Sequence, residues 1–335
     1  MIDEGAALRV ARLVAPVHRT DAVAVAALRA RVAEDTPLLD AAARRWTHLG
    51  ADLDPTAVSV VGRLAWVRIN LGSLRGTFEP LRETLAERGR SAPRALGMQL
   101  GVLFGLLSSK VLGQFVLPLG GPGGGRLVVV GPNVLALAEE HGALADDIRR
   151  SVVLHEITHR LQFDATPWLA PHLAGLVRRY LDHARVDRAA VRELTARLPE
   201  VVAEVRATGS IQPLMDRVLT EEQSEVIAEA QGLMSLLEGH GNTAMFDAAQ
   251  DGLIADPDAV RTALASRRND VTSKILTAVA GLEMKRRQYR EGEAFVRDVL
   301  ELGGVDALNR AFEQPANLPR ADEVDDAPGW VARVS

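Results

Sequence analysis

His155-Glu156-Ile157-Thr158-His159 is the stretch that decides both the fold and the chemistry of this chain. On a helix, residues four positions apart share one face, so both imidazoles can reach a single metal ion. In H-E-x-x-H sites the glutamate takes a proton from water on a bound Zn²⁺. The pattern therefore predicts a helix with His155 and His159 as zinc ligands and Glu156 as the general base.

The surroundings of the motif support this interpretation. With 8 histidines and 44 acidic residues in 335 positions, about 0.03 matches to H-[DE]-x-x-H are expected by chance. Glu156 is the only acid between Ser151 and His159, which is typical of a buried active-site helix. Asp146 and Asp147 precede this run, and we expect them to serve as N-cap and first-turn acids.

Composition narrows the class of protein. The chain is 47% hydrophobic and 25% charged, which is typical of a globular protein. A net charge of −5 argues against a general nucleic-acid partner. The absence of cysteine excludes disulfides, thiolate metal sites and thiol catalysis, so the metal ligands must be histidines and carboxylates.

No export signal or membrane span is expected. The first 30 residues contain no uninterrupted apolar core, and the lack of cysteine fits a cytoplasmic protein. The most apolar stretch, Gln99–Leu119, has Lys110 near its middle. Because a spanning helix needs roughly 20 mostly apolar residues, we expect a buried helix followed by a strand here.

Apolar residues three and four positions apart predict a mainly α protein. Helices are expected at Ala6–Val14, Asp21–Glu34, Pro37–Leu49 and Thr56–Glu87. One β signal stands out, because Gln114–Leu117 and Arg126–Val130 flank a run of glycines and should form a hairpin. Leu127–Val130 precedes the metal helix, and an edge strand in this place can bind an extended peptide by strand addition.

A third metal ligand is predicted within Thr220–Gln250, which begins with a capping box. At 100° per residue, Glu238 lies about 40° from the apolar position Met234, so this carboxylate should be buried. Three acids fall on the opposite, solvated face: Glu222, Glu225 and Glu229. A buried carboxylate needs a partner, and a metal bound also by His155 and His159 would supply it.

Several alternatives remain open at this point. Glu238 could instead form a buried ion pair with an arginine. His240 is a rival third ligand, but on a continuous helix it points about 200° away from Glu238, so both could bind one metal only if the helix breaks at the glycines beside His240. A broken helix would free His240 to stabilise an oxyanion, a role that Tyr289 could also serve. Two further histidines could serve as ligands: His172 and His183.

The chain resembles a zincin-like family of actinobacteria and Chloroflexi, formerly a domain of unknown function. Members of that family are labelled hydrolases, zinc-dependent metalloproteases or coenzyme F420 biosynthesis-associated proteins. The matching stretches are Leu112–Phe115, His155–Phe163, Pro167–Leu169, Ser235–Asn242, Lys285–Tyr289 with Gly292 and Phe295, Leu308–Arg310, Pro315, and Leu318 to Trp330.

The resemblance implies one zincin-like domain over residues 1–335, mainly α, with a small β-hairpin or sheet next to the metal helix. Residues 1–95 would form an N-terminal helical part, and 96–335 the metal-site core and C-terminal helices. The expected activity is zinc-dependent hydrolysis of a peptide, or of another small amide or ester. The alternative is a non-catalytic helical scaffold whose zinc site is structural or vestigial; a cleft with an open coordination position beside Glu156 would distinguish the two.

Overall fold

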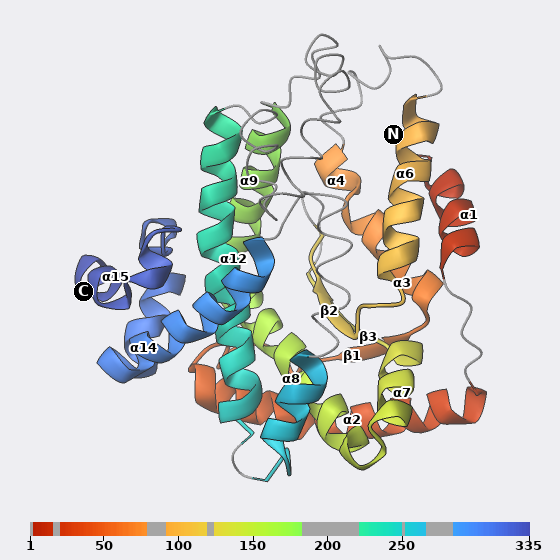
Figure 1. Cartoon of the computed structure of the whole chain (residues 1–335), viewed down its shortest axis with the longest axis horizontal. Coiled ribbons are helices and arrows are strands. Elements are labelled where there is room, and N and C mark those ends of the chain that lie inside the picture. Colours follow the sequence, from red (N-terminus) through yellow and green to blue (C-terminus); the bar gives the residue numbers. More distant parts are fainter. Residues whose placement is uncertain are drawn as a thin grey trace, which may run out of the picture.

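Helices make up most of the structure and surround a small sheet (Figure 1), which confirms the mainly α prediction. The computed structural model describes residues 3–15, 21–78, 92–118, 124–182, 221–249, 252–265 and 284–335. The first elements are α1 (Glu4–Val14), α2 (Ala22–Thr47), β1 (Val58–Val61), α3 (Arg63–Ser73), α4 (Arg75–Phe78), α6 (Ala92–Leu107), β2 (Gly113–Val116) and β3 (Arg126–Val130). They are followed by α7 (Gly131–Glu140), α8 (Ala145–Asp164), α9 (Leu169–Asp182), α12 (Glu221–Asp247), α14 (Met284–Glu313) and α15 (Ala327–Val334).

The three strands form one sheet in the order β1-β3-β2. The central strand, β3, runs parallel to β1 and antiparallel to β2, and places Val129 opposite Val60 and Gly113. The β2–β3 pair confirms the predicted hairpin, whose tip at 119–123 lies outside the described residues. The prediction of a helix from Thr56 onward is wrong at β1, because its parallel partner is distant in sequence and leaves no local signal.

Both faces of the sheet are covered. Leu127 and Val129 belong to one core with α2, α7 and α8, whereas Val128 and Val130 belong to another with α1 and α3. This two-sided burial explains why the strand is apolar at every one of these positions. The strand order also shows that β3 offers no open edge: β3 is central, and β1 and β2 are the two outer strands of the described sheet.

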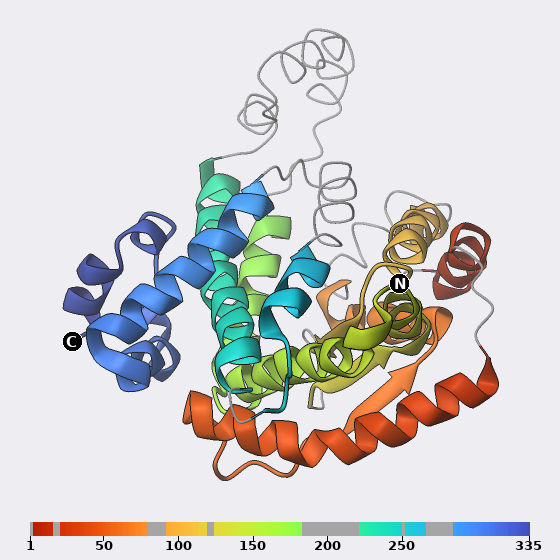
Figure 2. The same ribbon diagram turned by 60° about the horizontal axis from the view of Figure 1, so that its bottom comes forward.

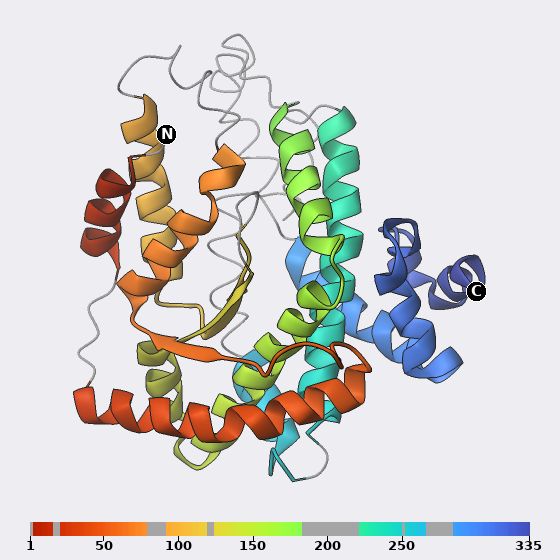
Figure 3. The same cartoon turned by 180° about the vertical axis from the view of Figure 1, so that it is seen from behind.

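α2 is one long helix, although Pro37 predicted two. It lies beneath the sheet and α8, along the lower edge of the molecule in Figures 2 and 3. The Thr36 hydroxyl donates a hydrogen bond to the Val32 carbonyl in the turn before the proline. Leu28 and Leu39, on the two sides of Pro37, are buried in the same core, and this packing offsets the missing backbone hydrogen bond.

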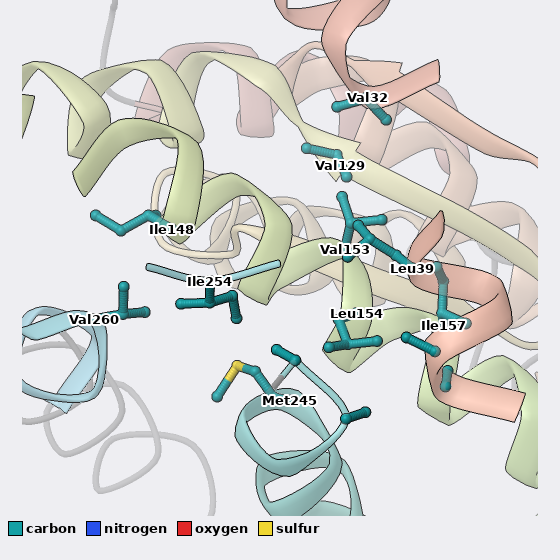
Figure 4. Packing of buried hydrophobic residues seen from close by; sticks show 14 of the residues in the cluster. Val32, Leu39, Val129, Ile148, Val153, Leu154, Ile157, Met245, Ile254 and Val260 are labelled. Carbon is teal, nitrogen blue, oxygen red and sulfur yellow. The ribbon is translucent and has the colours of Figure 1, made fainter. Parts of the chain in front are cut away.

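α8, which carries the H-E-x-x-H motif, is buried on nearly every side. It contacts α2, α7, β2, β3 and α12, and Figure 4 shows its side chains between Val129 of β3 and Met245 of α12. The expectation of a buried helix is confirmed, but Leu144 and not an acid occupies the N-cap position. Asp146 and Asp147 lie in the first turn, where the Asp147 carboxylate accepts the backbone N–H of Ala255 at 3.1 Å.

The C-terminal helices form a second core around α12. Trp330 of α15 is fully buried there. α12 and α14 approach closely because Gly239 has no side chain. A Cβ at this position would lie only 2.1 Å from the carbonyl oxygen of Gly292. α14 is interrupted at Gly304, whose φ of 69° favours glycine.

The apolar helix α6 is only half buried, which corrects the expectation of a fully buried helix. Gly97 packs against the backbone of Asp3, the N-cap residue of α1, and Gly101 and Gly105 pack against the backbone of α1 itself. Met98, Val102 and Leu106 are 45%, 41% and 42% exposed on the outer side. Among the helices in the described part of the chain, none is long and apolar enough to cross a membrane.

A buried ion pair fixes α8 to α2. Asp35 of α2 accepts hydrogen bonds from Arg149 at 2.7 and 3.0 Å and from Arg150 at 3.1 Å. The Arg149 side chain is 6% exposed and also bonds to Asp146, which pairs in turn with the 58% exposed side chain of Arg31. The Asp146 carboxylate therefore joins the buried Arg149 and the solvated Arg31.

Arg149→Met is expected to lower the free energy of unfolding by about 3 kcal/mol, since it leaves Asp35 buried with one of its two arginines removed. Arg31→Met removes the exposed partner of Asp146, the acid that Arg149 also binds, and should lower the free energy of unfolding by less than about 1 kcal/mol. Urea unfolding of both variants measures the difference. Equal losses would contradict the anchoring role of the buried pair.

Candidate metal centre

Two helices bring three ligand atoms together. His155 and His159 of α8 face Glu238 of α12, and the three candidate ligand atoms all lie within 4.8 Å of one another. The Nε2 atoms of the two histidines are 3.0 Å apart, and the Glu238 Oε2 lies 3.6 Å from His155 Nε2 and 3.9 Å from His159 Nε2. In the part of the chain that the structure describes, no other cluster of three such residues is found.

The donor set fits a zinc ion. Two imidazole nitrogens and one carboxylate oxygen are the ligands of many catalytic zinc sites. Donor atoms about 2.1 Å from a tetrahedral zinc lie about 3.4 Å from one another. The three observed separations fall on both sides of this value, so small side-chain rotations would suffice to bind the ion.

Glu238 lies on the more buried side of α12, away from the exposed acids of the same helix. Glu222, Glu225 and Glu229 are exposed, as expected for the solvated stripe, whereas the Glu238 side chain is 20% exposed. α12 runs without interruption through the glycines on either side of His240. For this reason His240 points away from the cluster and does not join the three candidate ligands.

Gly241 allows α12 to lie against both imidazoles. A Cβ at this position would lie 3.0 Å from the Cε1 of His155 and 3.3 Å from the Cε1 of His159. Such contacts are tighter than normal packing, so any larger residue would push the rings. Gly241 therefore makes room for the two candidate histidine ligands, while Gly239 makes room for the contact with α14.

Glu156 of α8 is buried beside the cluster, and its carboxylate contacts β2. Its Oε2 accepts a hydrogen bond from the Phe115 backbone N–H at 2.8 Å. Gly113 leaves the necessary space, since a Cβ there would lie 2.7 Å from the Glu156 Cγ. Burial raises the pKa of Glu156 to about 7; nearby His159 and the Phe115 N–H oppose this shift, and the charge of Glu238 adds to it.

Sequence reasoning did not identify Gln162, which links His159 to His240. Its Oε1 is 2.8 Å from His159 Nδ1, and its Nε2 is 2.8 Å from His240 Nδ1. His240 is fully buried between Trp46 and Phe312, and burial lowers its pKa to about 3. The one signal in the sequence was the position of Gln162 three residues after His159, on the same face of α8.

The cluster opens into a cavity of about 590 Å³. Its floor is formed by α8 and β2, and Figure 1 shows β2 between α9 and α12 on one side and α6 on the other. One wall is apolar, with Phe163, Leu173 and Met234. The opposite wall comes from α3, α6 and the turn before β2, and it contains Asn70 and Lys110.

The remaining candidates lie elsewhere. His172 packs against Trp168 with ring centroids 5.9 Å apart, and burial lowers its pKa. It is not part of the three-residue cluster. His183 and the side chain of Tyr289 lie outside the described residues.

Fold and site together define a class of protein. The chain belongs to the zincin-like metallopeptidase family, whose sequence profile matches residues 2–331, and this confirms the resemblance seen in the sequence. It is also similar to a Chloroflexus aurantiacus protein whose crystal structure is described as that of "a putative hydrolase with a novel fold". The two chains share 27% identity and a TM-score of 0.72, over 99% of this chain and 98% of that one. A comparison with curated proteins gives no match.

Gly241→Ala is expected to weaken zinc binding roughly tenfold, because metal affinity depends on ligand positions within about 0.2 Å. The free energy of unfolding should change by less than about 1 kcal/mol, since the helix propensity of alanine opposes the tight contacts. Gly175→Ala on α9 meets nothing within 4 Å and is the matched control. Competition with a chelator gives the affinities; unchanged zinc affinity in Gly241→Ala would contradict the close fit.

Proposed function

We propose that this protein is a zinc-dependent hydrolase, and specifically a peptidase. Zn²⁺ would be held by His155, His159 and Glu238, and Glu156 would act as the general base. The observation that carries the proposal is the convergence of these three donors, beside a buried carboxylate, at the floor of a large cavity. Membership of the zincin-like metallopeptidase family supports it.

The zinc and Glu156 would have separate roles in hydrolysis. When bound, the zinc would lower the pKa of its water and polarise the scissile carbonyl. Glu156 would accept the proton of that water, because the Phe115 N–H engages one carboxylate oxygen and leaves the other as the proton acceptor. The same hydrogen bond holds the carboxylate against the strand, so that the base keeps its orientation during turnover.

The outer strand β2 supports a peptide as substrate. The Val130 N–H donates to the Leu112 carbonyl, so polar backbone groups at every second residue from Leu112 face β3. The backbone groups of Gly113, Phe115 and Leu117 therefore point away from β3, and these residues line the cavity. Glu156 already accepts the Phe115 N–H, so an extended peptide could add to this edge through the Phe115 carbonyl and the backbone groups of Gly113 and Leu117, with its apolar side chains against the cavity wall.

A structural zinc site is the competing explanation. Structural zinc is usually held by four protein ligands in a closed site. Within the described residues only three donors converge, and they adjoin a cavity and a carboxylate suited to general-base chemistry. These features favour hydrolysis over a scaffold role.

Glu238→Ala should lose most bound zinc, because two imidazoles alone hold the ion poorly, and His155→Ala and His159→Ala should do the same. Glu225→Ala removes an exposed carboxylate from the same helix and should retain zinc at the wild-type level. Metal content of the purified proteins, after dialysis against a weak chelator, is the measurement. Near-stoichiometric zinc in the Glu238→Ala variant would exclude this residue as a ligand.

Glu156→Gln keeps the shape of the side chain and removes the base. We expect zinc content and fold to be retained and turnover to fall by about 10²- to 10⁴-fold. The measurement is cleavage of a peptide library by wild type and variant at equal zinc content. Equal turnover would assign the activity to another site, and no cleavage of peptides or esters by the wild type would favour the structural-zinc explanation.

A further inference from the structure

Gln162 is fully buried at the contact between the two helices that carry the candidate ligands. Its side chain reaches three groups: His159 Nδ1 at 2.8 Å, the Leu237 carbonyl oxygen at 3.1 Å and His240 Nδ1 at 2.8 Å. Leu237 directly precedes Glu238. One amide thus connects a metal-ligand histidine on α8 with the backbone beside the third ligand on α12.

The Leu237 carbonyl decides the orientation of this amide. A carbonyl oxygen can only accept a hydrogen bond, so the group that faces it must be the NH₂ of Gln162. The second proton of the NH₂ points to His240 Nδ1, which must then be the unprotonated nitrogen of that ring. The Gln162 Oε1 is left for His159 alone.

This orientation determines the tautomer of His159. Because Oε1 is an acceptor, His159 Nδ1 must carry the proton and donate it to Gln162. The lone pair of His159 then lies on Nε2, the nitrogen that faces His155 and Glu238. The ring is prepared to bind a metal before the metal arrives.

We propose that Gln162 is a positioning residue of the metal centre, and that His240 and the Leu237 carbonyl hold its amide in the required orientation. This inference rests on the proposed metal site and deepens it. Gln162 fixes the tautomer and rotation of His159. Through its hydrogen bond to the Leu237 carbonyl it also fixes the position of Glu238 along α12 relative to α8. His240 serves as a buried, neutral acceptor between Trp46 and Phe312, and has no contact with the substrate cavity.

The test separates hydrogen bonding from packing. Gln162→Met keeps the length of the side chain and removes its donor and acceptor, whereas Gln162→Glu keeps an oxygen that can accept from His159. We expect Gln162→Met to raise the zinc Kd by roughly 10- to 100-fold. Gln162→Glu should recover only part of this loss, because its carboxylate can accept from His159 but cannot donate to the Leu237 carbonyl and to His240. Gln223→Met is the matched control, since Gln223 is a buried glutamine in the first turns of α12 and its loss should leave the Kd unchanged.

A Kd for Gln162→Met within twofold of wild type would overturn the proposal, as would a wild-type Kd for Gln162→Glu, since the donors to Leu237 and His240 would then have no role. If neither variant folds, the wild-type protein decides the question by ¹⁵N NMR of its imidazoles. The proposal requires His240 to be protonated at Nε2, and protonation at Nδ1 would mean that the amide is reversed. A wild-type protein that binds no zinc would instead contradict the proposed function, while the histidine tautomers would still report on Gln162.

Discussion

The close contact between α8 and α12 is the constraint on which the rest of the structure depends. The two imidazoles come from one helix and the carboxylate from the other, so neither helix can form the cluster alone. Gly241 removes the side chain that would separate them, and Gln162 bonds across the contact. Because Gly239, two residues before Gly241 on α12, contacts α14, the same short stretch also sets the distance to the C-terminal helices.

The central position of α8 has a cost, because it buries polar and charged groups that water would otherwise solvate. The fold meets this cost with specific partners: Asp35 for Arg149, the Phe115 N–H for Glu156, and the Leu154 carbonyl for the Thr158 hydroxyl. The bonds to Asp35 of α2 and to the Phe115 N–H of β2 join α8 to other elements in fixed directions, so these two also determine the rotation of the helix about its axis. A helix held by apolar contacts alone could turn slightly, and the histidines would then miss the carboxylate.

The parts of the site that depend on local helix geometry could be predicted from the sequence. His155 and His159 are four residues apart on one helix, and Glu238 was predicted from its position near the apolar face of another. The structure brings these three side chains together. Contacts between distant segments could not be predicted in this way. β1 depends on a parallel partner far along the chain, and Gln162 is an ordinary polar residue until α12 presents Leu237 and His240 to it.

The N-terminal part is more than a covering layer for the metal helix. α2 anchors α8 through Asp35, and Asn70 and Leu74, from α3 and its C-cap, line the cavity opposite α9 and α12. A protein that lacked this part would lose one cavity wall together with the buried partner of Arg149. The physical unit of the site therefore extends over both halves of the chain, which is consistent with a family match that spans residues 2–331 and is not confined to the metal motif.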